Sequence, residues 1–274
     1  MTVEASDIVS DGSVRLHRQR TDIPFTPDNI MVIETGFKDL QRIDSAFTAA
    51  MKKEAELSTC HPFAWNPEFG YVTARPAMCG TGLQISALFH LEGLHLIGDL
   101  EPAKNALSAL RMTVRGCEAD GMRDAAHIFR IENGSQLGIG EREILTRVKR
   151  AFSDLCRQES NARIRLVEEM PRVFEDAIAR SLAVLRACRL ISEWELLDIV
   201  SPLRLAAELG FLENFTRKDA LEITRARLNM PVSAPPDTYD EMRERDRQDA
   251  ALADKVNKRF RNVRLNAYAK DRLS

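Results

Sequence analysis

The amino-acid sequence predicts an α+β domain followed by a helical domain. From about residue 30 to 135, short strand-like runs mix with helical segments, and from about residue 140 onward almost every segment has helical periodicity. Strands in hairpin-like succession that are followed by a run of helices are typical of an α+β domain joined to a helical one.

The first expected helix covers residues 39–57, because its apolar residues recur at helical spacing. These residues are Leu40, Ile43, Phe47, Ala50, Met51 and Leu57. Prolines and a glycine between residues 62 and 70 end this helix, and residues 71–75 (YVTAR) predict a short strand. A Gly-Thr-Gly turn at residues 80–82 precedes residues 85–92, whose alternating pattern predicts a strand of a sheet.

Further elements follow in the same way. Residues 101–111 predict a helix with a proline in its first turn, and residues 112–116 and 127–133 predict two more strands. Apolar stripes then predict helices around residues 144–155 and 174–185.

Capping-box spacing marks two more helix starts, at Ser192 with Glu195 and at Thr216 with Asp219. Residues 238–260 predict a charged helix with a thin apolar stripe. The stripe consists of Met242, Leu252, Val256 and Phe260.

Composition and charge exclude several classes of protein. The 274 residues are 44% hydrophobic and 29% charged, which is ordinary for a globular protein, and the net charge of -2 favours neither nucleic acid nor an anionic membrane. No apolar run approaches the roughly 20 residues that span a bilayer, and the N-terminal MTVEASDIVS does not resemble a signal peptide. Five cysteines without a CxxC pair and histidines without ligand spacing predict reduced thiols and no metal site. We therefore expect a cytoplasmic protein.

Three stretches carry a resemblance to a known family. Residues 6–25, SDIVSDGSVRLHRQRTDIPF, are similar to the motif Ser-Ser-Arg-x-Arg-Leu-Ala-Arg-Asn. Residues 68–86, EFGYVTARPAMCGTGLQIS, are similar to Gly-Tyr-Leu-Thr-x-Cys-Pro-Thr-Asn-x-Gly-Thr-Gly-Leu-Arg-Ala-Ser. Residues 114–145, VRGCEADGMRDAAHIFRIENGSQLGIGEREIL, are similar to Arg-Gly-x-x-Gly-Glu followed by Ile-Ser-Asn-x-x-x-Leu-Gly. All of these motifs belong to the guanidino (phosphagen) kinases, which transfer the ATP γ-phosphoryl group to a guanidinium nitrogen.

The helical region resembles the C-terminal region of the bacterial protein-arginine kinases. The likeness lies in residues 180–212, RSLAVLRACRLISEWELLDIVSPLRLAAELGFL, and in residues 243–255, RERDRQDAALADK. The second stretch is similar to the Arg-Asp-x-x-Arg-Ala motif that binds phosphoarginine, which implies Arg245 and Asp246 as phosphoarginine-binding residues. Asp249 replaces the second arginine and would repel a phosphate, so a solvated charged helix is the alternative.

The resemblance implies an antiparallel sheet flanked by helices, shortened on its N-terminal side, and then a helical C-terminal domain. Residues 1–165 would form the truncated catalytic-like domain, and residues 166–274 the domain that resembles the phosphoarginine-binding domain. Residues 26–40, TPDNIMVIETGFKDL, faintly resemble the acidic loop Asn-Glu-Glu-Asp-His-x-Arg-Ile, with Asp28 identical.

The resemblance also implies the residues of a catalytic site. Phosphoryl transfer depends mainly on positioning and on neutralising phosphate charge, which the family achieves with arginines. The implied ATP-phosphate-binding positions are Arg15, Arg18, Arg75, Gln84 and Arg115. The implied catalytic acids are Asp28 and Asp120.

Several positions depart from the family pattern. Ser13, Met31 and Gln84 stand where the motifs have arginine, and Thr26 and Pro27 lie where the acidic loop has its two glutamates. Loss of an arginine on a transferring phosphate costs about 10³–10⁵ in rate, and loss of a general base about 10²–10⁴. These departures predict a pseudokinase.

Each retained residue also has a structural interpretation. Arg15, Arg18 and Arg115 fit ion pairs, Arg75 fits an exposed arginine of a strand, and the glycines of residues 80–82 fit a tight turn without a phosphate.

We therefore expect a non-catalytic regulator or scaffold that acts through protein partners, either an arginine kinase or the protein-degradation machinery, and the resemblance also allows a homodimer. One alternative is an active ATP:protein-arginine phosphotransferase with a rebuilt site, which would use Mg-ATP as cofactor if the nucleotide site survives. Another is a phosphoarginine-binding module without ATP. Nucleic acid, membrane and metal are not expected.

Overall fold

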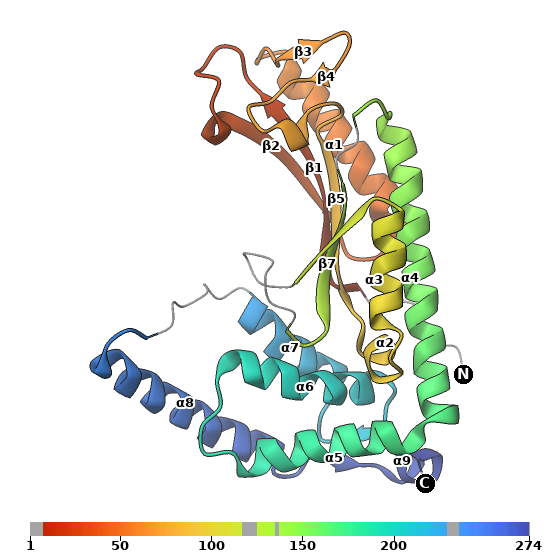
Figure 1. Ribbon diagram of the computed structural model, residues 1–274, viewed down its shortest axis with the longest axis vertical. Helices are drawn as coiled ribbons and strands as arrows, with labels where there is room; N and C mark the ends of the chain where they lie inside the picture. Colours follow the sequence, from red (N-terminus) through yellow and green to blue (C-terminus); the bar gives the residue numbers. More distant parts are fainter. Residues whose placement is uncertain (1–7, 117–124, 135–136, 229–235, 274) are drawn as a thin grey trace. The chain divides into compact units, whose positions relative to one another are not determined.

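The computed structural model describes residues 8–116, 125–134, 137–228 and 236–273 (Figure 1). The chain divides into two compact units, each built from segments that are separate in the sequence. Unit 1 comprises residues 1–89, 101–115 and 129–158, and unit 2 comprises residues 90–100, 116–128 and 159–274. The predicted domain boundary after residue 165 stays a prediction.

The main sheet belongs to unit 1, and its described strands lie in the order β2-β1-β5-β7-β6 (Figure 1). The strands are β1 (Ile8–Gln19), β2 (Ile30–Phe37), β5 (Leu83–His90), β6 (Met112–Gly116) and β7 (Ile128–Asn133). The β1 strand pairs antiparallel with both β2 and β5. The helices of this part of the chain are α1 (Ile43–Ser58), α3 (Leu100–Ala109) and α4 (Glu141–Glu169), and the residues of α4 from Glu159 onward belong to unit 2. The predicted α+β class, an antiparallel sheet flanked by helices, is confirmed.

Strand β1 has a buried face and a polar face, because successive residues of a strand point to opposite sides of a sheet. Val14, Leu16 and Arg18 are fully buried, and Arg18 bonds a residue of α1, so this face meets the helix. Ser13 and His17 lie on the opposite face, where polar side chains of neighbouring strands join them. One strand thus supplies both a core and a polar surface.

The predicted strand at residues 71–75 is wrong beyond Tyr71. The structure has only the short pair β3 (Trp65–Asn66) and β4 (Gly70–Tyr71), followed by the 3₁₀ helix η3 (Pro76–Met78). The Thr73 hydroxyl donates to the Arg75 carbonyl oxygen and accepts from the Arg75 amide, and this local bonding competes with strand pairing. The 3₁₀ helices η1 (Pro27–Asn29) and η2 (Leu40–Arg42) flank β2, a strand that the sequence pattern did not predict.

The Gly-Thr-Gly turn is held by backbone hydrogen bonds. Tyr71 and Gly80 exchange both of their amide-to-carbonyl bonds, at 2.8 and 2.9 Å, and the His17 amide donates to the Gly82 carbonyl at 2.8 Å. Gly82 has a φ of 57°, and a Cβ there would lie 2.5 Å from the His17 carbonyl oxygen and 2.7 Å from Arg18 Nη1. Glycine is therefore required at residue 82 for both its conformation and its close approach.

Gly82→Ala is expected to lower the free energy of unfolding by about 2–4 kcal/mol, because strain from a left-handed residue adds to a backbone clash. Gly98→Ala is the matched control, since Gly98 also has a positive φ, of 82°, but a Cβ added there would have no atom within 4 Å. Urea unfolding of both variants separates the clash from the conformational strain. Equal losses in the two variants would contradict the close approach at Gly82.

Unit 2 is predominantly helical, with one short strand pair. Its elements include α2 (Glu92–Leu96), α5 (Pro171–Ala187), α6 (Glu193–Glu208), β8 (Leu212–Glu213), α7 (Arg217–Leu228), α8 (Tyr239–Phe260), β9 (Arg264–Leu265) and α9 (Ala267–Leu273). Their apolar faces form one core around Phe174, Phe211 and Phe260. None of the helices in the described ranges combines the length and the apolar character needed to cross a membrane.

The predicted helix starts of unit 2 are confirmed. Ser192 and Glu195 form a reciprocal capping box at α6, and Thr216 and Asp219 bond each other at the start of α7. The predicted stripe on α8 is wrong at Met242, which is 58% exposed. Burial on this helix is confined to its C-terminal part, so its N-terminal part has no apolar contact face.

A buried ionic network lies in the core of unit 2. Glu159 accepts hydrogen bonds from the Gly93 amide at 2.9 Å, from the Leu94 amide at 2.9 Å and from Arg163 Nε at 2.7 Å. Arg163 Nη1 also reaches Glu208 at 3.1 Å. Both Glu159 and Arg163 are 2% exposed, so their charges depend on these partners rather than on water.

Candidate functional site

A row of polar side chains crosses the sheet of unit 1 on the face opposite α1. It consists of Glu34 on β2, Arg15 on β1, Gln84 on β5, Glu132 on β7 and Arg115 on β6. Arg15 lies directly opposite Glu34 in one register and directly opposite Gln84 in the other. We call these five residues the polar row. Three of the five predicted phosphate-binding positions belong to it.

The contacts within the polar row are short and specific. Arg15 Nη2 lies 2.9 Å from Glu34 Oε1, and Arg115 Nε lies 3.1 Å from Glu132 Oε1. Gln84 Nε2 donates to Glu132 Oε2 at 2.7 Å. One carboxylate, that of Glu132, therefore joins the glutamine and the arginine that flank it.

His17 extends this network along β1. Its Nε2 donates to Gln84 Oε1 at 3.2 Å. Burial lowers the pKa of the His17 imidazole, and the guanidinium groups of Arg15, Arg18 and Arg75 lower this pKa further. The hydrogen bond to Gln84 raises the pKa but does not reverse the shift. His17 is therefore held mainly in its neutral form at neutral pH.

Arg18 belongs to the other face of β1. It is fully buried, its Nε lies 3.0 Å from Glu54 Oε1 on α1, and its Nη1 donates to the carbonyl oxygens of His17 and Thr81. Its guanidinium carbon lies 3.6 Å from the centre of the Tyr71 ring, and the Tyr71 hydroxyl donates to the same Glu54 oxygen. The geometry gives Arg18 a structural role in joining β1, α1 and the Gly-Thr-Gly turn.

The remaining predicted catalytic-site residues are Arg75, Asp28 and Asp120, and none of them belongs to the polar row. Arg75 is exposed at the start of η3. Asp28 is exposed in η1, and within the described residues no hydrogen bond or ion pair joins it to the polar row. Asp120 lies outside the residues that the structure describes.

The charges of the polar row balance one another. Its two guanidinium groups face two carboxylates, and the Glu132 side chain is only 8% exposed while those of Arg15 and Arg115 are 36% and 57% exposed. Two like charges about 4 Å apart repel by about 4 kcal/mol at an effective dielectric constant near 20. An ATP phosphate placed over this row would therefore meet a buried carboxylate between its two arginines.

Sequence reasoning missed Glu132, although the motif contains a clue. In the run Ile-Ser-Asn-x-x-x-Leu-Gly, Glu132 occupies the place of the serine, next to Asn133. The Asn133 side chain accepts from the Ile85 amide at 2.6 Å and donates to the Leu83 carbonyl at 2.8 Å, so that it fixes β7 against β5. The change from serine to glutamate thus places a charge at a rigidly positioned point.

The predicted phosphoarginine-binding pair lies on α8 of unit 2. Arg245 and Asp246 are both exposed, in the part of the helix without apolar contacts. Nearby, burial raises the pKa of the Asp249 carboxyl, Arg245 lowers it, and the acidic side chains of Glu195, Asp246 and Glu193 raise it. The surroundings of Arg245 are thus acidic, which disfavours a phosphate.

Two family models match this chain. Residues 29–162 match the model of the ATP:guanido phosphotransferase C-terminal catalytic domain. Residues 171–270 match the model of the protein-arginine kinase McsB C-terminal domain. The two matches follow one another along most of the chain.

The chain is also similar to curated proteins named protein-arginine kinase. It is 32% identical over 182 residues to the protein from Listeria welshimeri, covering 66% of this chain and 54% of that protein. It is 32% identical over 195 residues to the protein from Clostridium novyi, covering 69% and 57%. The chain therefore spans about half the length of the curated relatives it matches.

Among solved structures, the chain is similar to the substrate-free duplicated taurocyamine kinase from Schistosoma mansoni. The TM-score is 0.40 at 15% sequence identity, and the match covers 48% of this chain and 17% of that chain.

Proposed function

The chain belongs to the ATP:guanido phosphotransferase family and carries the C-terminal domain of the protein-arginine kinases, and from this premise we propose that it is a non-catalytic member of that family. It would act as a regulator or scaffold through protein partners, either an arginine kinase or the protein-degradation machinery. The chain would also be able to form a homodimer. Family membership alone leaves open whether the chain catalyses phosphoryl transfer.

The observation that carries this proposal is the carboxylate of Glu132 between Gln84 and Arg115. At these two positions the family resemblance implies arginines that hold ATP phosphates. Here one arginine is a neutral glutamine, and the other is paired with an acidic side chain. Phosphoryl transfer requires excess positive charge around the phosphates, whereas the two arginines and two glutamates of the polar row sum to no net charge.

Two further observations support the loss of catalysis. Arg18 is buried against Glu54, so its guanidinium cannot meet a phosphate, and Glu34 offsets the charge of Arg15. The acidic residue Asp28, which would take the proton of an acceptor guanidinium, is exposed in a short turn and has no contact with the polar row within the described residues. A general base acts only within hydrogen-bond reach of its proton.

The retention of the helical unit supports a role in protein binding. Among the described residues, unit 2 has an apolar core, capped helices and a buried ionic network, and none of these belongs to the polar row. A fold that keeps its packing while its charged site is neutralised is suited to presenting surfaces.

We expect the purified chain to transfer no phosphoryl group from Mg-ATP to an arginine-rich protein. The measurement is acid-labile phosphate on the acceptor after incubation with γ-labelled Mg-ATP, with the Clostridium novyi relative as the positive control. Chain-dependent acid-labile phosphate above the background would overturn the proposal. It would favour the alternative of an active phosphotransferase that uses a rebuilt site.

A further inference from the structure

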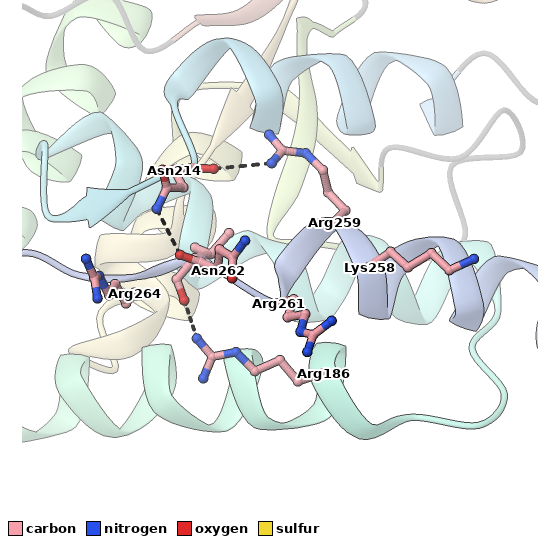
Figure 2. Close-up of a pocket in the computed structure, with 8 residues that line it drawn as sticks. Arg186, Asn214, Lys258, Arg259, Arg261, Asn262 and Arg264 are labelled. Carbon is pink, nitrogen blue, oxygen red and sulfur yellow. Dashed lines mark hydrogen bonds between the residues drawn. The ribbon is translucent and has the colours of Figure 1, made fainter.

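Unit 2 contains a basic pocket of about 610 Å³ at the turn between α8 and β9 (Figure 2). We call it the basic pocket. Among the described residues, its lining consists of Arg186, Asn214, Lys258, Arg259, Arg261, Asn262, Val263 and Arg264. It includes neither Arg245 nor Asp246, and it is independent of the proposed loss of catalysis.

The wall of the basic pocket is built by hydrogen bonds rather than by loose side chains. Asn214 Nδ2 donates to the Asn262 carbonyl at 3.0 Å, and Arg259 Nη1 donates to the Asn214 carbonyl at 3.2 Å (Figure 2). Arg186, from α5, donates to the carbonyl oxygens of Phe260 and Val263. Asn214 has a φ of 63°, a left-handed conformation that asparagine tolerates. These bonds fix the turn, so the pocket is formed without a ligand.

The charges that line the basic pocket are only partly neutralised. Arg259 is paired with Asp219 at 2.5 Å, and Arg264 is paired with Glu213 at 2.6 Å. In the part of the chain that the structure describes, no carboxylate pairs with Arg186, Lys258 or Arg261. The pocket therefore presents three positive charges that no acidic side chain balances.

The lining also limits the kind of anion that fits. Among the described residues that line the basic pocket, Val263 is the one apolar residue. This lining contains no aromatic ring on which a nucleobase could stack. Guanidinium groups bind oxyanions in a bidentate manner, and side-chain amides add neutral donors. The volume lies within the usual range of roughly 300–1,000 Å³ for small-ligand sites and exceeds the space that one phosphate fills.

We propose that the basic pocket binds a ligand with two or more linked phosphoryl groups, and that it recognises the phosphoryl groups and not a base. Lys258 and Arg261 meet the phosphoryl oxygens, and Arg186, from α5, adds positive charge. Because its free charge is threefold positive, pyrophosphate and tripolyphosphate match it better than a single phosphate does.

The test is calorimetric titration of the full chain with pyrophosphate, tripolyphosphate and ATP, without magnesium, at low salt. We expect Lys258→Ala and Arg261→Ala each to weaken pyrophosphate binding by about tenfold, since each removes one charge-assisted contact. Both side chains are exposed and make no hydrogen bond within the described residues, so these variants keep the fold. Lys255→Ala is the matched control, because Lys255 is an exposed cation of the same helix outside the pocket.

Three outcomes would overturn the proposal. The first is the absence of pyrophosphate binding by the unaltered chain. The second is an equal loss in Lys255→Ala, which would indicate attraction by overall charge. The third is tighter binding of ATP than of tripolyphosphate, which would show that a base is recognised. Equal affinity for ATP and tripolyphosphate, together with the two expected losses, supports it.

Discussion

Arg18→Ala is expected to lower the free energy of unfolding of unit 1 by about 3–5 kcal/mol, the usual result of removing one partner of a buried ion pair. The substitution leaves Glu54, which is 7% exposed, with the Tyr71 hydroxyl as its remaining partner. It also removes the two bonds from Nη1 to the carbonyl oxygens of His17 and Thr81. A phosphate-binding arginine on an open face would show no such loss.

The measurement is urea unfolding followed by tryptophan fluorescence. The chain has two tryptophans, so a Trp194→Phe background leaves Trp65, on β3 of unit 1, as the reporter. Arg15→Ala is the control, because its partly exposed pair with Glu34 is worth only about 0–1 kcal/mol. A change of less than about 1 kcal/mol for Arg18→Ala would contradict the buried pair.

A double replacement sharpens the same test. Arg18→Met combined with Glu54→Leu removes both charges and keeps apolar volume at both sites. It is expected to destabilise unit 1 less than Arg18→Ala does, because neither charge is then left buried alone. A double variant that is less stable than Arg18→Ala would contradict this explanation. It would show that loss of the ion pair itself, and not the unpaired Glu54 charge, accounts for most of the loss in the free energy of unfolding.

Glu159→Ala is expected to lower the free energy of unfolding of unit 2 by about 3–5 kcal/mol, because it abandons Arg163 and two backbone amides in the core. Gly93 and Leu94 donate their amides to this carboxylate and have no other acceptor for them within the described residues. Arg163 keeps its bond to Glu208, which limits the loss.

A Trp65→Phe background reports on unit 2 through Trp194, which lies in α6. Glu168→Ala is the matched control, since Glu168 is exposed on the same helix and its loss should change stability by about 0.5 kcal/mol or less. Equal losses in the two variants would contradict the network, because Glu168→Ala leaves no buried partner behind and alanine is the better helix former.

Much of the fold could be predicted from local patterns. The strands β5, β6 and β7 and the helices α1, α3, α5 and α8 all arise where apolar spacing or a cap indicates them. The local pattern does not indicate strand β2, because its two buried positions, Ile33 and Phe37, lie four residues apart with the polar Thr35 between them on the same face. Its pairing partner, β1, provides what the local pattern lacks.

The candidate site was harder to predict because its contacts join distant strands. Arg15 and Arg18 look alike in the sequence, yet alternation along β1 sends them to opposite faces, one partly exposed and one buried. The Glu132 carboxylate meets Gln84 only through the order of the strands, which no local motif encodes. The basic pocket likewise gathers Arg186 and Arg261 from separate segments.

The position of β1 between β2 and β5 has a consequence for how the chain folds as it is synthesised. The β1–β2 hairpin can form early, but the inner edge of β1 must wait for β5, where Val14 meets Ile85. Such non-local pairing slows folding, and an unpaired edge recruits other strands. During translation, the nascent chain therefore exposes an aggregation-prone edge until residues 83–90 have left the ribosome, and chaperone demand should concentrate in that interval.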